Sequence, residues 1–255
     1  MKPLEECEEK FADMKKTMSS AAAGKATVRM IGRKTKARLA KPFGPDQRNA
    51  LSTLCANLGF ASVDQPLRTI AITSAMANEG KTTIAIELAR AMAASGKRTL
   101  LVECDMRRRS LAGRLGAHAQ AGICSVVLGD VDPARAIVRT TVPLLHLLDA
   151  ESGVACPVDI LDSQSFRALI ARLGRRFDCV VVDTPPVGLF VDAAVVGSAV
   201  DATLLVVREG FAERAMVTKA CDQLRKGGAN LVGVVMNCCE EAASRYRAYE
   251  GIAER

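Results

Sequence analysis

From residue 46 onward, apolar and polar positions alternate in blocks whose periods predict strands and helices in turn. Runs such as RTIAIT, TLLVE and CVVVD are apolar at successive positions, which is typical of strands covered on both faces. The segments between them have the spacing of helices that would supply this cover. The pattern predicts an α/β fold with a mostly parallel open sheet flanked by helices. The expected strands are residues 68–73, 99–103, 144–148, 179–183, 203–207 and 231–236, and the expected helices are 46–60, 81–95, 163–174, 192–199 and 213–226.

The positive charge is concentrated at one end of the chain. The 255 residues carry a formal net charge of +7, and residues 1–45 contribute +6 of it, with eleven Lys and Arg against five Asp and Glu. Nine of these basic residues lie between Met14 and Lys41, with no acidic residue among them. We therefore expect a flexible basic N-terminal arm over 1–45, a folded domain over 46–240 and a C-terminal tail over 241–255.

Composition also bears on the compartment. No stretch is apolar enough to span a membrane, because the most apolar one, residues 180–200, is interrupted by Asp and Pro. The first ten residues lack the apolar segment of a secretory signal, so we expect a cytoplasmic protein. The nine cysteines are odd in number and include no CxxC spacing, which favours reduced thiols. The adjacent pair Cys238 and Cys239 is the one candidate for metal or redox chemistry.

The first expected strand leads directly into a phosphate-binding motif. Residues 75–82 read A-x4-G-K-T between a strand and the start of a helix, which is the context that this loop requires. The backbone N–H groups of such a loop point at phosphate oxygens. We therefore predict a P-loop NTPase fold that binds ATP and Mg²⁺, with Lys81 on the β- and γ-phosphates and the Thr82 hydroxyl on the metal. The loop residues expected to bind the nucleotide are Ala77, Asn78, Glu79, Gly80, Lys81, Thr82 and Thr83.

Polar side chains follow three other expected strands. Glu103 and Asp105 stand at i and i+2 on one strand end, a spacing that points both carboxylates toward the metal and the γ-phosphate. Solvated loop acids are the alternative for this pair. Asp183 follows four apolar residues, where P-loop proteins carry an acid that supports magnesium. Asn237 closes the last strand, where its amide either reads the adenine edge or belongs to a plain turn.

The chain has only two tyrosines, Tyr246 and Tyr249, and both lie in its last ten residues. Tyrosine normally goes into cores and interfaces, so its concentration in a polar tail indicates another use. A tail that presents phosphoacceptor tyrosines accounts for this placement. Chance is the alternative, because the number is small.

Taken together, these motifs resemble those of the bacterial tyrosine kinases, and most of all the cytoplasmic type used in capsular and exopolysaccharide synthesis. The resemblance rests on TSAMANEGKTT, LLVECDMRR, VVVDTPPVG followed by VDAA, GVVMN, NALSTLCANLGFAS and the tyrosine-bearing tail, and it covers about residues 46–250. It implies a P-loop ATPase fold, related to MinD and ParA, and autophosphorylation of C-terminal tyrosines. By this resemblance, the residues that hold ATP and Mg²⁺ are Lys81, Thr82, Asp105 and Asp183, and Glu103 helps to accept the tyrosine proton.

The resemblance also implies partners. They are a membrane adaptor of the polysaccharide chain-length regulator type that activates the kinase, a cognate phosphatase, and further copies of the chain in a ring. It implies a tyrosine autokinase that regulates polysaccharide synthesis and export at the inner face of the cell membrane. The chain departs from the family in having Glu103 in place of an Asp, and only two tail tyrosines. It also has Asn49, Ser52 and Cys55 where relatives carry Glu and Arg that support ring assembly.

Two other functions stay open on the sequence. A positioning ATPase of the MinD/ParA kind shares the fold, but that family carries an additional Lys where this loop begins Ser74-Ala75-Met76. An ATP-binding scaffold without transfer activity is the second. The basic arm favours weak attraction to anionic membrane, with a solvated tail as the alternative. Nucleic acid is not an expected partner, because the folded domain is nearly neutral.

Overall fold

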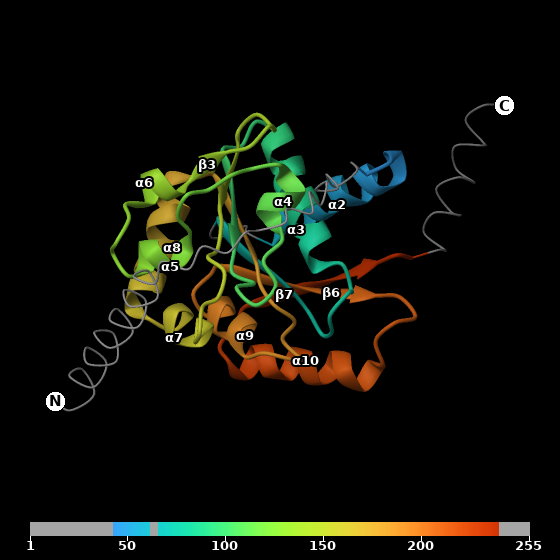
Figure 1. The fold of residues 1–255 in the computed structure, drawn as a ribbon. Coiled ribbons are helices and arrows are strands. Elements are labelled where there is room, and N and C mark those ends of the chain that lie inside the picture. The colour runs from blue at the N-terminus through green and yellow to red at the C-terminus, as the bar shows by residue number, and fades with distance from the viewer. Residues whose placement is uncertain (1–42, 62–65, 240–255) are drawn as a thin grey trace, which may run out of the picture. The chain divides into compact units, whose positions relative to one another are not determined.

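The computed structural model describes residues 43–61 and 66–239. Within them, a seven-stranded sheet has the order β3-β4-β2-β5-β1-β6-β7 (Figure 1). Neighbouring strands are parallel except for β3 and β4, which pair antiparallel at one edge. The α/β class and the mostly parallel sheet are therefore confirmed. The strands are β1 (Thr69–Ser74), β2 (Thr99–Glu103), β3 (Val138–Arg139), β4 (Leu145–Leu148), β5 (Cys179–Asp183), β6 (Ala202–Arg208) and β7 (Leu231–Asn237).

Helices cover both faces of this sheet (Figure 1). Helix α3 packs on β1, β2 and β5, and α2 packs on α3. Side chains of β6 alternate between the faces: Leu204 and Val206 belong to the cluster that includes α3, whereas Leu205 and Val207 pack with α9 and α10. The helices of the described residues are α2 (Pro45–Phe60), α3 (Lys81–Ala94), α4 (Leu111–Leu115), α5 (Ile123–Val127), α6 (Pro133–Ala136), α7 (Pro157–Leu161), α8 (Gln164–Arg176), α9 (Asp192–Gly197) and α10 (Arg214–Lys226).

The central strands are apolar at successive positions because they have no solvent face. Every residue of β1, β2 and β5 is buried. Strand β7 differs, since it lies at the edge of the sheet and leaves Val234 and Met236 about half exposed. The continuous apolar runs that predicted two-sided cover therefore mark the centre of the sheet.

The path of the chain places a crevice beside β1. From β1 the chain passes through α3 to β2, and from β5 it passes through α9 to β6 on the other face of the sheet. Strands β1 and β5 are neighbours, so their connections leave in opposite directions. Ligands of open α/β sheets bind at such a point, beyond the carboxyl ends of the strands.

The structure adds short elements that the sequence pattern did not predict. They are the two-residue strand β3 and four helices of four or five residues, α4 to α7. Segments this short contain too few residues for a period of 2 or 3.6 to be visible. The expected helix over 192–199 also ends two residues early, at Gly197.

Candidate active site

The phosphate-binding motif forms the turn between β1 and α3. Gly80 has φ of +97° and is the N-cap of α3, and the N–H of Ile84 donates to its carbonyl oxygen at 3.0 Å. A Cβ on Gly80 would also meet Nδ2 at the end of the Asn237 side chain, so the positive φ is the stronger reason for glycine here. Asn78 also has positive φ, +68°. The loop thus presents its N–H groups at the N-terminus of a helix, as the sequence predicted.

Two side chains fix the shape of this loop from behind. The carboxylate of Glu79, which is fully buried, accepts from the N–H of Met76 at 2.6 Å and of Arg208 at 3.3 Å. The amide of Asn237 donates to the carbonyl oxygen of Glu79 at 2.8 Å. The side chain of Glu79 therefore faces the protein interior, and only its backbone N–H can contribute to nucleotide binding. The adenine contact of Asn237 stays a prediction, because the observed partner of its amide is the loop.

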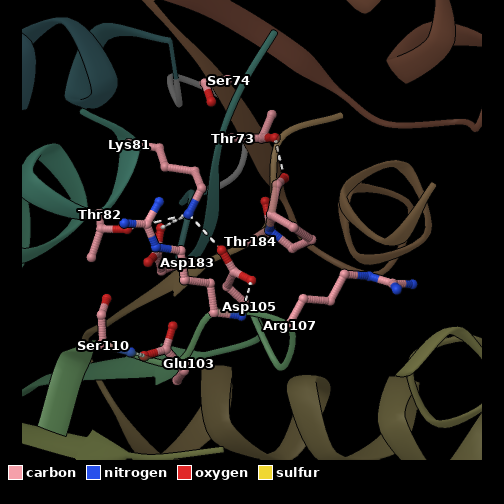
Figure 2. A network of polar contacts seen from close by, with 12 residues as sticks. Thr73, Ser74, Lys81, Thr82, Glu103, Asp105, Arg107, Ser110, Asp183 and Thr184 are labelled. Carbon is pink, nitrogen blue, oxygen red and sulfur yellow. Dashed lines mark hydrogen bonds and ion pairs between the residues drawn. The ribbon is translucent and has the colours of Figure 1, made fainter. Parts of the chain in front are cut away.

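Three oxygen atoms surround the ammonium group of Lys81 (Figure 2). Lys81 Nζ lies 2.7 Å from Oδ2 of Asp105, 3.2 Å from Oγ1 of Thr82 and 3.9 Å from Oδ1 of Asp183. Asp105 and Asp183 come from the ends of β2 and β5, the two strands predicted to carry acids. The structure thus brings Lys81, Thr82, Asp105 and Asp183 together at one point.

Asp183 has no exposed surface and no hydrogen-bond partner for either carboxylate oxygen among the described residues. Burial raises the pKa of Asp183 to about 6. The charge of Lys81 opposes this rise, and the charge of Asp105 adds to it. Asp183 is thus a buried carboxylate whose nearest cation is Lys81 at 3.9 Å, and it can accept a further cation or hydrogen-bond donor.

Glu103 takes a different direction from Asp105. Its Oε2 accepts from the N–H groups of Ser110 and Leu111, at 2.8 and 2.7 Å, at the start of α4 (Figure 2). Its other oxygen, Oε1, is buried without a partner in the described residues. Burial, followed by the charge of the neighbouring Asp183, raises the pKa of Glu103 to about 8. Asp105 therefore faces Lys81, whereas Oε2 of Glu103 faces the N–H groups at the start of α4, and the approach of both acids to the metal and the γ-phosphate stays a prediction.

A cleft of about 470 Å³ opens at this point. The phosphate-binding loop and the start of α3 form one wall. The other wall comes from the segment after β2, together with apolar residues of the loop between β5 and α9. The cleft is lined by Ala77, Asn78, Gly80, Lys81, Thr82, Thr83, Asp105, Arg107, Arg108, Ser110, Arg114, Pro186, Leu189 and Phe190.

The arginines of the second wall line the cleft and were not named by the sequence analysis. Arg107 binds the buried carboxylate of Asp192 through Nε at 3.1 Å and a terminal nitrogen at 3.2 Å, and its guanidinium lies 4.1 Å from the centre of the Phe190 ring. In Figure 2 its side chain extends away from Lys81. Arg114 donates to Oγ1 of Thr83 at 2.9 Å. The sequence did contain a sign of them, because Arg107 and Arg108 directly follow the segment with the paired acids and Asp192 lies in the VDAA segment.

The remaining sequence expectations have mixed outcomes. Tyr246 and Tyr249, the basic residues before Pro42 and the tail boundary lie outside the described residues. The eight cysteines within them are all unpaired thiols, Cys238 and Cys239 included. None of the described helices is long and apolar enough to cross a membrane.

Strand β1, the loop, α3 and the acids of β2 and β5 define a P-loop nucleotide-binding protein. A family model described as an AAA domain matches residues 67–216. The chain is 32% identical over 208 residues to tyrosine-protein kinase CpsD of Streptococcus agalactiae, an alignment that covers 81% of this chain and 89% of that protein. It therefore belongs to the family of bacterial tyrosine kinases.

Solved structures agree with this family. The kinase domain of the Escherichia coli tyrosine kinase ETK matches with a TM-score of 0.72 and 25% identity, covering 80% of this chain and 84% of that one. The septum site-determining protein MinD of Pyrococcus horikoshii, in complex with Mg-ADP, matches with a TM-score of 0.59 and 23% identity, covering 66% and 69%. The MinD likeness concerns the fold alone, which is the P-loop NTPase fold predicted from the sequence.

Proposed function

We propose that this chain is a protein-tyrosine kinase that transfers the γ-phosphoryl group of ATP to tyrosine, with Tyr246 and Tyr249 of its own C-terminal segment as acceptors. Membership of the bacterial tyrosine kinase family supports the reaction. The observation that carries the proposal is the convergence of Thr82, Asp105 and Asp183 on the ammonium of Lys81 beside the phosphate-binding loop. As the family resemblance implies, the process that it regulates is the synthesis and export of capsular or extracellular polysaccharide.

Phosphate binding falls to the loop and Lys81. The N–H groups of residues 77–83 lie at the N-terminus of α3, where the helix dipole favours anions. Lys81 lies beside the cleft and neutralises charge on the β- and γ-phosphates. Phosphoryl transfer depends mainly on positioning and charge stabilisation, so these groups supply much of the catalysis.

The residues present fit a magnesium ion. Thr82 and Asp105 line the cleft with oxygen atoms, and Asp183 brings two buried oxygens without hydrogen-bond partners. Among the described residues, no group of three or more His, Cys, Asp or Glu side chains has the arrangement of a complete protein metal site. This agrees with Mg²⁺, which is held by one or two carboxylates together with phosphate oxygens and water. When bound, the ion neutralises phosphate charge and orients the terminal phosphate.

The proton of the acceptor tyrosine goes to a carboxylate in this proposal. We assign it to Glu103, whose raised pKa lies close to physiological pH, as general-base catalysis favours. We assign the proton to Oε1, which is buried without a hydrogen-bond partner among the described residues, because Oε2 is bound to the backbone of α4. Asp105, which lines the cleft, orients Lys81 beside it.

The partners are proposed from the family resemblance. They are a membrane adaptor of the chain-length regulator type, a cognate phosphatase and further copies of this chain. A location at the inner face of the cell membrane follows from the adaptor. The nine basic residues between Met14 and Lys41 would add attraction to anionic lipid, with each charge near the surface worth about 1 kcal/mol.

The test is incubation of the purified full chain with labelled ATP, followed by mass spectrometry of the C-terminal peptide. We expect phosphate on Tyr246 and Tyr249 only, and its loss when both are changed to Phe, with ATP hydrolysis retained. Nucleotide hydrolysis without any phosphotyrosine, in the presence of the adaptor's cytoplasmic segment, would favour an ATPase of the MinD kind. ATP binding with neither reaction would favour a scaffold.

A further inference from the structure

Three consecutive arginines, Arg107 to Arg109, follow the acids of β2, and two of them are tied to buried carboxylates. The guanidinium of Arg107 binds Asp192, and that of Arg109 lies 2.6 Å from Asp149; both acids are about 1% exposed. Arg108 stands between them and lines the cleft. Among the described residues no carboxylate forms an ion pair with its guanidinium, so its charge is not neutralised locally.

The backbone of Arg108 is fixed at the reactive centre. Its N–H donates to Oδ1 of Asp105 at 2.9 Å, while Oδ2 of the same carboxylate binds Lys81. The side chain then reaches the phosphate-binding loop, where a terminal nitrogen lies 3.4 Å from Oδ1 of Asn78. The guanidinium therefore lies at the loop while its Cα is held beside the carboxylate that orients Lys81.

The contact with Asn78 is weak and easily exchanged. A length of 3.4 Å exceeds the usual 2.9–3.0 Å of such hydrogen bonds, and the acceptor is neutral. A phosphate oxygen is charged and makes shorter, stronger bonds with a guanidinium. Arg114, the other arginine near the loop, has a partner of ordinary length in Thr83, and its charge also acts on Asp183. Arg108 is thus the arginine of this wall that is available to a phosphate.

We propose that Arg108 is a catalytic residue that donates to oxygen atoms of the terminal phosphate of ATP during transfer. The bond from the γ-phosphorus to the β–γ bridging oxygen breaks, and a bond to the tyrosine oxygen forms. ADP leaves with the electron pair of the broken bond, and the tyrosine proton goes to a carboxylate. Negative charge grows on the bridging oxygen as this happens, and a guanidinium beside it stabilises the transition state more than bound ATP.

This inference rests on the proposed kinase function and adds a source of positive charge to it. An arginine in this role raises kcat by about 10³- to 10⁵-fold in other phosphoryl-transfer enzymes. Lys81 already acts on the same phosphates, so we expect Arg108→Ala to lower kcat by roughly 10²- to 10³-fold. Arg108→Lys keeps the charge without the planar fork and should recover part of the loss.

The experiment measures binding as well as rate, in the full-length chain with Mg²⁺. Wild type, Arg108→Ala and Arg108→Lys are titrated with a non-hydrolysable ATP analogue and with ADP plus aluminium fluoride, which mimics the transferring phosphoryl group. We expect Arg108→Ala to bind the analogue within about threefold of wild type and the mimic at least roughly 10²-fold more weakly. Arg172→Ala, on the exposed face of α8, removes the same charge as a control and should change neither.

Two results would overturn the inference. One is equal affinity of wild type and Arg108→Ala for the mimic. The other is an equal loss of affinity for the analogue and the mimic, which would make Arg108 a ground-state binding residue. Failure of the kinase proposal looks different, because wild type would then bind the mimic and hydrolyse ATP without labelling tyrosine.

Discussion

The two walls of the cleft are built by different means. The phosphate-binding loop is a single short segment between β1 and α3, held by backbone geometry and by the buried Glu79 and Asn237. The facing wall, residues 104–115, is held through side chains that reach distant parts of the chain, such as the pair of Arg107 and Asp192, 85 residues apart. The first wall is fixed locally, whereas the second depends on the tertiary fold.

This difference separates two tasks. Binding phosphate needs N–H groups at fixed positions, which a glycine-containing turn at a helix N-terminus provides by itself. Stabilising the transferring group needs charges placed to within a fraction of an ångström around it. In this protein, long-range ion pairs and helix α4 hold the backbone and the neighbouring side chains of that wall. The walls should therefore respond differently to mutation.

The largest expected effect comes from the loop wall. Lys81→Met removes the charge that faces the phosphates and should lower tyrosine phosphorylation by more than about 10³-fold. The change also removes the cation beside the buried Asp105 and Asp183, so persistence of the fold is checked in the same sample. The measurement is phosphotyrosine formation with circular dichroism of the same sample. Lys219→Met, at an exposed position of α10, is the matched control. Full phosphotyrosine labelling of Lys81→Met would show that Lys81 is not needed for the transfer.

The next effect tests Glu103, the last residue of β2, directly before the facing wall. Glu103→Gln keeps an oxygen for the N–H groups of Ser110 and Leu111 but removes the base, so transfer should fall by roughly 10²- to 10⁴-fold with ATP affinity unchanged. Because a base acts when deprotonated, wild-type transfer should rise as pH passes through about 8, and the variant should lose this rise. An unaltered transfer rate in Glu103→Gln would mean that Glu103 is not the base and serves only to bind the N–H groups at the start of α4.

A smaller effect concerns the long-range ion pair. Asp192→Ala leaves Arg107 without its two bonds, and we expect the free energy of unfolding to fall by about 1–3 kcal/mol, since a third of the Arg107 side chain is exposed and stays hydrated. Asp162→Ala, which breaks the exposed pair with Arg167, is the control and should cost no more than about 1 kcal/mol. Urea denaturation measures both. Equal losses of unfolding free energy in the two variants would mean that the burial of Asp192 does not strengthen its ion pair.

The last effect is a pH dependence of stability, comparable in free energy to the loss of the ion pair. The pKa of Glu103 is about 8 in the folded protein and 4.5 for an ordinary Glu, so the folded state holds the proton more tightly. Stability from this group is complete below pH 4.5 and is lost as pH rises through 8. Thermal unfolding should show Tm falling by several degrees between pH 6 and 9 in wild type, at about 2–4 °C per kcal/mol. Glu103→Gln should flatten this slope, and parallel slopes would contradict the assignment.

The contrast between the walls also explains how far the sequence could be interpreted. The loop, Asp105 and Asp183 were predictable because parallel strands end at the same edge of a sheet, which brings their following residues together. Their meeting at Lys81 needs no knowledge of side-chain packing. The strands and helices of the centre were predictable for another reason, because the apolar runs and helical spacing are long enough to show their periods.

The facing wall was not predictable in this way. Glu103 was expected to point at the phosphates, but α4 has only five residues and no visible period, so the pull of its N–H groups was not anticipated. The pairing of Arg107 with Asp192 joins segments with no pattern in common. Such contacts depend on how loops pack, which periodicity does not encode.

Gly80 has a consequence for how this site tolerates sequence change. Its backbone conformation disfavours any side chain, and the amide of Asn237 occupies the space beside it. A compensating change at Asn237 would open space without making the left-handed backbone acceptable to alanine. A substitution at Asn237 alone would therefore not make another residue acceptable at position 80. Sequence drift in this protein should therefore leave Gly80 unchanged.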